Sequence, residues 1–301
     1  MPCFSPLKAW RSRIPTKAGK YPPVFDVKYG YEDRPLSLPC GQCIGCRLEY
    51  SRQWAIRCMH EASLHEDNCF VTLTYSDEHI PVTGSLDKST LQRFLKRLRR
   101  SVSPARFRLF SCGEYGDNFG RPHYHVLLFG LDFADKRFFK RTPAGHRLFT
   151  SEFLDERWGL GSCYVGDVTF DSAAYVARYV VKKIKGDAAY EHYRSWNLVT
   201  GEEVQIEPEF STKSNRGGIG RGWYDQFKDG VYRNDSVIVN GHEVKPPRFY
   251  DGLFEMDCRE SYMAVRARRI REAQCDDNTP SRLKVREKVA TAKLGLFTRR
   301  S

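Results

Sequence analysis

The stretch GRPHYHVLLFG, residues 120–130, decides the fold expected for this chain, because it has the apolar pattern of a buried β-strand but carries two histidines. Side chains of a strand alternate between its two faces, so His123 and His125 point to one side while Tyr124 and Val126 point to the other. The two imidazoles are therefore directed jointly at one target, unless they are polar residues on a solvated face of the strand.

A second strand is expected just before the first, at residues 107–116, and the two are joined by DNFGR, a turn rich in Asp, Asn and Gly. This pattern predicts a β-hairpin. If the turn is centred on the Asn-Phe step, Glu114 lies opposite His123, and both share a face with His125. Two imidazoles and a carboxylate can bind a divalent ion and leave its other positions open to substrate oxygens and water.

The segments around this hairpin predict an α+β fold. Leu91, Phe94, Leu95 and Leu98 recur at helical spacing and indicate an amphipathic helix. We expect helices at about 47–64, 87–100 and 171–184, and strands at 69–76, 107–116, 122–130 and 161–170. The order of these elements predicts a central antiparallel sheet flanked by helices.

Three parts are expected along the chain. Residues 1–66 are a Cys-rich N-terminal arm and helix, residues 67–195 the core, and residues 196–301 a Gly-rich loop followed by a basic C-terminal region. The first 44 residues lack sustained periodicity and are interpreted as an extended arm or loop. In the last part, an Asn-Gly dipeptide predicts a hairpin, and residues 260–274 predict a basic helix. The Gly-rich loop lacks the Gly-Lys-Ser/Thr ending of a phosphate-binding loop, so nucleotide binding is not expected.

Positive charge points to a polyanionic partner. The 301 residues carry a formal net charge of +12, and residues 259–301 hold 12 Lys/Arg against 5 Asp/Glu. Arg93, Arg97 and Arg100 fall on the outer face of the helix at 87–100, where they either contact DNA or are simply solvated. No apolar run suits a membrane span or a signal peptide, so we expect no membrane partner and a cytoplasmic location.

The cysteine pattern raises the possibility of a structural zinc site. Ten cysteines in a chain without a secretory signal favour thiols over disulfides. The candidate zinc ligands are Cys40, Cys43, Cys46 and Cys58. A C-x-x-C turn directs two thiolates at one ion, and zinc usually takes four ligands. The fourth position stays open between Cys58, His60 and Cys3, and the alternative is a set of reduced cysteines in a turn before a helix.

Two tyrosines share one face of the helix expected at 171–184, for which Asp171 or Ser172 is the expected N-cap. These are Tyr175 and Tyr179, and Lys182 and Lys183 continue their stripe one turn later. Such a stripe often faces a core. A tyrosine can also act as a covalent nucleophile, but its ordinary pKa of about 10 means that it needs help from a metal, a base or a cation.

The order of these motifs resembles that of the HUH endonucleases that initiate rolling-circle replication. The matching stretches are FVTLTYSD (70–77), CGEYG (112–116) with RPHYHVLLFG (121–130), and YVARYVVKK (175–183). The similarity is greatest to the replication initiators of microviruses, especially the gokushovirus branch. PCGQCIGCR and the later GIG stretch look like further features of that branch. Paired tyrosines with a following lysine are the most specific element, since many related initiators carry one tyrosine.

The resemblance implies a fold and a site. The implied fold is the HUH type, with RRM- or ferredoxin-like topology, and the implied ion is Mg²⁺ or Mn²⁺. The implied site residues are the metal ligands Glu114, His123 and His125 and the catalytic residues Tyr175, Tyr179 and Lys182. Whether Lys182 or Lys183 acts at the phosphate stays open, and we expect Lys183 to contact DNA. The family often has Pro before GIG where this chain has Gly217-Gly218, so that loop is given no role.

The implied activity is metal-dependent nicking and rejoining of single-stranded phage origin DNA through a covalent 5′-phosphotyrosine. The implied partners are the single-stranded or supercoiled phage origin, a host polymerase and a host helicase, and the implied location is the cytoplasm of a host bacterium. The alternative is a non-enzymatic, zinc-stapled DNA-binding protein that uses the cysteine cluster and the basic C-terminal region. Salt-dependent DNA binding without cleavage would favour this alternative.

Overall fold

A computed structural model of the chain divides into two compact units. The residues that it describes are 3–17, 19–116, 120–184, 187–197, 199–273 and 278–298, without the side chains of 179–182 and 296–298. One unit comprises residues 1–50 and 271–301, and the other residues 51–270. The first boundary between these units falls inside helix α1 (Ile44–Ala62) and the second at residues 270/271. The expected divisions at 66/67 and 195/196 stay predictions.

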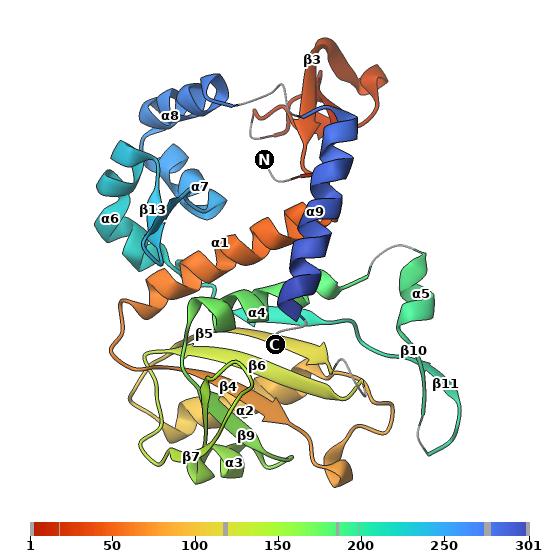
Figure 1. Cartoon of the computed structure of the whole chain (residues 1–301), viewed down its shortest axis with the longest axis vertical. Coiled ribbons are helices and arrows are strands. Elements are labelled where there is room, and N and C mark those ends of the chain that lie inside the picture. The colour runs from red at the N-terminus through yellow and green to blue at the C-terminus, as the bar shows by residue number, and fades with distance from the viewer. Residues whose placement is uncertain are drawn as a thin grey trace. The chain divides into compact units, whose positions relative to one another are not determined.

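Among the described residues, the larger unit is built on a seven-stranded antiparallel sheet in the order β12-β5-β6-β4-β9-β8-β7 (Figure 1). The strands are β4 (Asn68–Thr74), β5 (Arg108–Tyr115), β6 (Pro122–Phe129), β7 (Arg137–Arg141), β8 (Arg147–Thr150), β9 (Cys163–Gly166) and β12 (Phe210–Lys213). The expected α+β class with a central antiparallel sheet is confirmed. The sheet also takes an edge strand, β12, from beyond residue 195, which was not expected.

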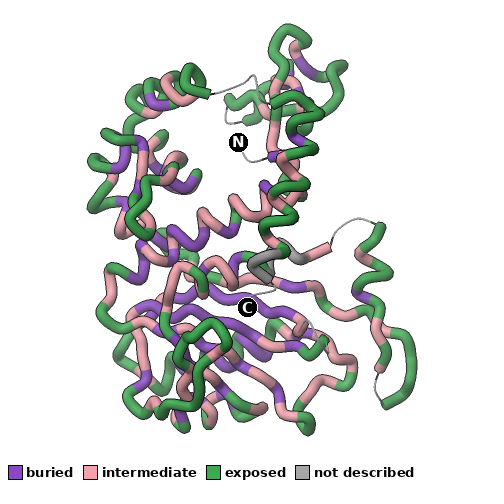
Figure 2. The backbone as a smooth tube through the Cα atoms, viewed as in Figure 1, coloured by how far each residue is buried: buried purple, intermediate pink, exposed green. Residues whose placement is uncertain are grey.

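The order β4-α2-β5-β6-α3-β9 has the βαββαβ arrangement of a ferredoxin-like fold, with α2 (Lys88–Ser101) and α3 (Glu152–Trp158) between the strands. Both helices pack on one face of the sheet. Figure 2 shows buried positions running along the central strands. The core on this face includes Leu91, Phe94 and Leu98 of α2, Trp158 of α3, and Val71, Tyr124, Val126 and Leu128 of the strands.

The opposite face of the sheet is covered by α4 (Phe170–Lys182) and by the part of α1 that belongs to the larger unit. Ala173, Val176 and Ala177 of α4 pack there with Trp54, Ala55 and Cys58 of α1 and with Phe110, Leu127 and Phe129 of the sheet. The hydroxyl of Ser51 donates to the carbonyl oxygen of Ala174 at 2.7 Å. Helix α1 therefore packs directly against α4.

Helix α4 begins earlier than expected because its N-cap is Thr169, not Asp171 or Ser172. The Thr169 hydroxyl accepts from the backbone nitrogen of Ser172 at 3.1 Å, and the Ser172 hydroxyl accepts from the backbone nitrogen of Thr169 at 2.8 Å. This reciprocal capping box satisfies two amide groups that the helix itself leaves unpaired. It fixes the start of the helix that carries Tyr175.

The remaining elements of the larger unit follow α4. They are α5 (Ala188–His192), β10 (Arg194–Trp196), β11 (Glu203–Gln205), α6 (Arg221–Asn234), β13 (Val237–Val239), β14 (His242–Val244), α7 (Arg248–Asp257) and α8 (Arg259–Arg271). The expected hairpin is confirmed as β13–β14, and the expected basic helix as α8. Buried Asp235 joins these elements through ion pairs with Arg269 of α8 and with Lys245, the latter at 2.8 Å.

The smaller unit contains a three-stranded sheet of β1 (Leu7–Ser12), β2 (Pro23–Val24) and β3 (Gly30–Leu38), together with α9 (Pro280–Thr298). The prediction of an extended arm or loop was wrong for these strands. They are short or interrupted by proline, and many of their side chains are exposed, so no period-two apolar pattern marks them.

Short 3-10 helices lie at Val27–Tyr29 and Asp77–His79. No helix among the described residues has the length and apolar character needed to cross a membrane.

Candidate functional site

The hairpin of β5 and β6 brings Glu114, His123 and His125 together. Glu114 pairs directly with His123 across the two strands, as the equal spacing from the turn predicts. The Nε2 atoms of His123 and His125 lie 2.6 and 2.9 Å from the same atom, Glu114 Oε1. One ligand atom from each side chain falls within 4.8 Å of the others. The expected shared face of these three residues is confirmed.

Each imidazole is oriented through its other nitrogen. His123 Nδ1 donates to the carbonyl oxygen of Arg121 at 3.0 Å, because a carbonyl can only accept. With Nδ1 held in this way, Nε2 is the nitrogen directed at Glu114, and it is the atom through which the ring could bind a metal. His125 Nδ1 lies 3.0 Å from the hydroxyl of Thr72 on β4. Such outer contacts are typical of histidines that bind metal through Nε2.

Burial and charge at this site also suit a divalent cation. Burial raises the pKa of Glu114, but hydrogen bonds from His123 and His125 outweigh it and hold that pKa below its usual range. Burial lowers the pKa of His125, which favours the neutral ring that a metal needs. The second carboxylate oxygen, Glu114 Oε2, is buried and has no hydrogen-bond partner among the described residues. A buried anionic oxygen in this position fits a metal ligand.

Tyr175 of α4 reaches the same carboxylate. Its hydroxyl donates to Glu114 Oε1 at 3.2 Å, and its ring meets the His125 ring edge to face with centroids 5.2 Å apart. The structure thus brings Tyr175 to the three candidate ligands. Tyr179 and Lys182 belong to α4, but their side chains lie outside the described residues. Lys183 is the half-buried C-cap residue of the same helix.

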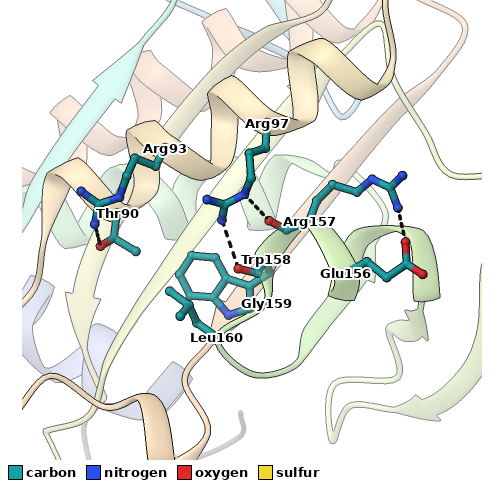
Figure 3. A pocket seen from close by; sticks show the side chains of 8 residues that line it. All are labelled: Thr90, Arg93, Arg97, Glu156, Arg157, Trp158, Gly159 and Leu160. Atoms are coloured by element: carbon teal, nitrogen blue, oxygen red, sulfur yellow. Dashed lines mark hydrogen bonds and ion pairs between the residues drawn. The ribbon is translucent and has the colours of Figure 1, made fainter.

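The arginines of α2 lie on the other side of the sheet from this site, since α2 packs against the face that bears Tyr124. A small cavity there, of about 350 Å³, is lined by Arg93, Arg97 and α3 residues (Figure 3). Arg97 donates to the last carbonyl groups of α3, at 2.8 Å to Arg157 and 3.1 Å to Trp158. Arg93 donates to Thr90 Oγ1 at 2.7 Å. Arg100 is exposed. Contact of these arginines with DNA stays a prediction, and the structure does not bring them to Glu114.

The cysteine cluster needs one correction. Cys40, Cys43 and Cys46 do come together, but the fourth thiol beside them is Cys3, not Cys58. Cys58 is fully buried among the apolar side chains between α1, α4 and the sheet. His60 is also absent from the cluster. Its ring stacks on that of Trp223, with the two ring centroids 3.5 Å apart. Burial lowers the pKa of His60 to about 4.

Sequence reasoning missed Thr72 and Arg121, which orient the two histidines. Both lie in stretches that the sequence marks, since Thr72 belongs to FVTLTYSD and Arg121 directly precedes Pro122. The missing information was that β4 pairs with β6, which sets Thr72 opposite His125. Nothing in the local pattern of either strand specifies that pairing.

Comparison with known proteins assigns the chain to a family. The model of the family described as replication-associated protein ORF2/G2P matches residues 68–184, which include Glu114, both histidines and Tyr175. The chain is 33% identical over 267 residues to the replication-associated protein VP4 of Bdellovibrio phage phiMH2K, covering 84% of this chain and 80% of that one. It is 30% identical over 239 residues to the replication-associated protein ORF2 of Spiroplasma virus 4, covering 75% and 70%.

A third relative is the replication-associated protein ORF4 of Chlamydia phage 1, with 27% identity over 261 residues that cover 82% of this chain and 61% of that one. No solved structure matches the chain. The extent of the first two matches is sufficient to assign the family. The chain belongs to the replication-associated proteins of the microviruses.

Proposed function

We propose that this protein initiates rolling-circle replication by nicking and rejoining single-stranded phage origin DNA through a tyrosine-linked intermediate. One observation carries the proposal: the Tyr175 hydroxyl and the imidazoles of His123 and His125 converge on a single oxygen of Glu114. A nucleophile and a metal-binding group therefore occupy one site. Membership of a replication-associated family supports a DNA substrate for this site.

Glu114, His123 and His125 are the residues that would hold Mg²⁺ or Mn²⁺. When bound, such an ion polarises a non-bridging phosphate oxygen of the DNA backbone. The Tyr175 hydroxyl, positioned by Glu114, attacks the phosphorus and forms one phosphoester bond. The bond to the 3′ oxygen of the preceding nucleotide breaks, and that oxygen takes up a proton in place of the one that Tyr175 gives up, so the step is balanced. Since one phosphoester replaces another, no ATP is needed for rejoining.

The family motif supplies the other parts of the proposal. Tyr179 would be the second nucleophile, which allows a second cut while the first link is resolved, and Lys182 would stabilise charge on the phosphate. Lys183 would contact DNA. A host polymerase would extend the released 3′ hydroxyl with the help of a host helicase, in the cytoplasm of the infected bacterium.

The test uses the full chain and the single-stranded genome of its own phage. After incubation with Mn²⁺ and digestion of the DNA, mass spectrometry should find a nucleotide linked to the peptide that contains Tyr175 and Tyr179, and EDTA should prevent its formation. DNA binding that weakens with salt, without any cleavage in Mg²⁺ or Mn²⁺, would instead support the non-enzymatic DNA-binding alternative.

Replacing Thr72 by Val should weaken metal binding at this site while leaving the fold intact. The change is nearly isosteric and removes the hydroxyl that lies 3.0 Å from His125 Nδ1. Loss of an outer contact of a metal ligand costs roughly 10–100-fold in affinity. We expect the Mn²⁺ concentration for half-maximal cleavage to rise by about that factor, with most of the activity restored at saturating Mn²⁺.

Thr74→Val is a matched control for this measurement. Thr74 lies on the same face of β4, opposite His123, but its hydroxyl donates to the carbonyl oxygen of Ser162 at 2.9 Å. The control should keep the Mn²⁺ dependence of the unmodified protein. Equal half-saturation for Thr72→Val and Thr74→Val would show that Thr72 does not orient a metal ligand.

A further inference from the structure

Four thiols of the smaller unit surround a single point. Cys3 Sγ lies 3.7 Å from Cys40 Sγ and 4.0 Å from Cys43 Sγ, and Cys40 Sγ lies 4.0 Å from Cys46 Sγ. All four sulfur atoms lie within 4.8 Å of one another. With a zinc–sulfur bond of about 2.3 Å, a tetrahedral site sets its sulfurs about 3.8 Å apart. The three distances of 3.7, 4.0 and 4.0 Å are close to that value, and they are far from the roughly 2.05 Å of a disulfide.

Backbone amides around the cluster point at the sulfurs. The amides of Gln42 and Cys43 donate to Cys40 Sγ at 3.4 and 3.3 Å. The amide of Phe4 donates to Cys43 Sγ at 3.3 Å, and the amide of Cys40 donates to Cys3 Sγ at 3.3 Å. Donors of this kind favour the thiolate over the thiol. Backbone donors thus reach the sulfurs of Cys3, Cys40 and Cys43, which is favourable for metal-bound thiolates.

The turn that carries two of the thiols is built for this geometry. Gly41 has φ of +74°, a left-handed conformation that glycine adopts without strain, and it lets Cys40 and Cys43 face the same point. Cys43 directly precedes α1, and Cys46 lies in its first turn. Negative charge on a metal–thiolate group is favoured at a helix N-terminus by the exposed amides and the helix dipole.

The smaller unit has little else to hold it together. Of its described apolar side chains, those of Cys3, Ala9 and Leu283 are buried. Short sheets with so small a core usually need a disulfide or a metal for stability. A metal at the four thiols would tie the segment before β1 to the end of β3 and the start of α1.

We propose that Cys3, Cys40, Cys43 and Cys46 bind one structural Zn²⁺ that stabilises the smaller unit. Four thiolates in tetrahedral arrangement are a typical closed structural zinc site. An iron–sulfur cluster of two or more irons is too large for four sulfurs that lie this close together. The site is separate from Glu114 and needs neither DNA nor Tyr175.

The test measures metal in the full chain, purified under reducing conditions without added metal. Elemental analysis should find one zinc per chain, and a mercurial that reacts with thiols should release it. Cobalt substitution should give the intense visible bands of a tetrahedral thiolate site. Zinc that is well below one per chain, or iron in its place, would overturn the proposal.

Cys3→Ser tests the ligand set, because Cys3 is far from the other three in sequence. Its zinc affinity, measured by competition with a chromogenic chelator, should fall by more than about 100-fold, since loss of a mere outer contact already costs roughly 10–100-fold. Cys258→Ser, which alters an exposed thiol outside the cluster, should keep the affinity of the unmodified chain. Unchanged affinity in Cys3→Ser would contradict the assignment.

Two further variants separate this site from the alternatives. Cys58→Ala should keep one zinc per chain, since the Cys58 thiol is buried elsewhere. Glu114→Gln should also keep its zinc while losing DNA cleavage, which distinguishes the structural ion from the ion proposed at the tyrosine site. Loss of zinc in Glu114→Gln would show that the two sites are not independent.

Discussion

Replacing both Tyr175 and Tyr179 by Phe should lower formation of the covalent protein–DNA adduct by roughly 10⁴-fold or more, as expected when a nucleophile is removed. The Tyr175 hydroxyl is the group that reaches Glu114, at 3.2 Å, and Phe keeps the ring while removing that oxygen. The packing of α4 through Ala173, Val176 and Ala177 is untouched. A denaturing gel with labelled DNA measures the adduct, and fluorescence anisotropy measures DNA binding, which should change little.

Tyr190→Phe is the matched control, because Tyr190 is an exposed tyrosine outside α4. It should form the adduct at the rate of the unmodified protein. The single variant Tyr175→Phe shows whether Tyr179 can form the link alone. A protein–DNA adduct on the denaturing gel of the double variant would refute the nucleophile assignment.

Replacing Glu114 by Gln should lower the rate of DNA cleavage by at least about 100-fold, since loss of a metal ligand exceeds the loss of an outer contact. Gln has nearly the same shape, but it removes the negative charge from the group on which His123, His125 and Tyr175 converge. Raising the Mn²⁺ concentration should recover part of the rate. Initial cleavage rates over a Mn²⁺ series measure both effects.

Glu61→Gln offers a control at a carboxylate of equal burial, since Glu61 and Glu114 are each 1% exposed. Glu61 accepts from the backbone amide of Gly220 at 2.6 Å and pairs with Arg108 at 3.1 Å, so its role is structural. This variant should lower stability in urea unfolding without changing the metal requirement of the folded protein. A Glu114→Gln protein with normal Mn²⁺ dependence would mean that the third ligand is another residue.

The sequence predicts those features of the site that depend on the local geometry of one hairpin, helix or strand. Glu114 and His123 are equally far from their turn, so the hairpin alone sets them opposite each other. The apolar spacing of α2 and the alternation along β6 likewise follow from the periods of helix and strand. These signals are sufficient for the α+β class and for the shared face of the three candidate metal ligands.

Features that depend on distant pairing could not be predicted in this way. Thr72 meets His125 because β4 pairs with β6, and β12 joins the sheet through a three-dimensional contact with β5. Cys58 is closer in sequence to Cys46 than Cys3 is, yet Cys3 lies beside the cluster. Separation in sequence does not predict this, because β1 and β3 pair antiparallel and bring the segment before β1 next to the segment after β3.

The three candidate metal ligands also differ from Tyr175 in how the chain assembles them. His123 and His125 follow Glu114 by 9 and 11 residues, whereas Tyr175 follows it by 61. Contacts between residues close in sequence form at a small cost in loop-closure entropy, whereas contacts between residues far apart in sequence form once more of the chain is ordered. We therefore expect the hairpin that carries the three candidate ligands to form before Tyr175 packs beside it. A partly folded chain would then hold the three candidate ligands without Tyr175 beside them, so the proposed attack on DNA would require a packed α4 as well as the hairpin.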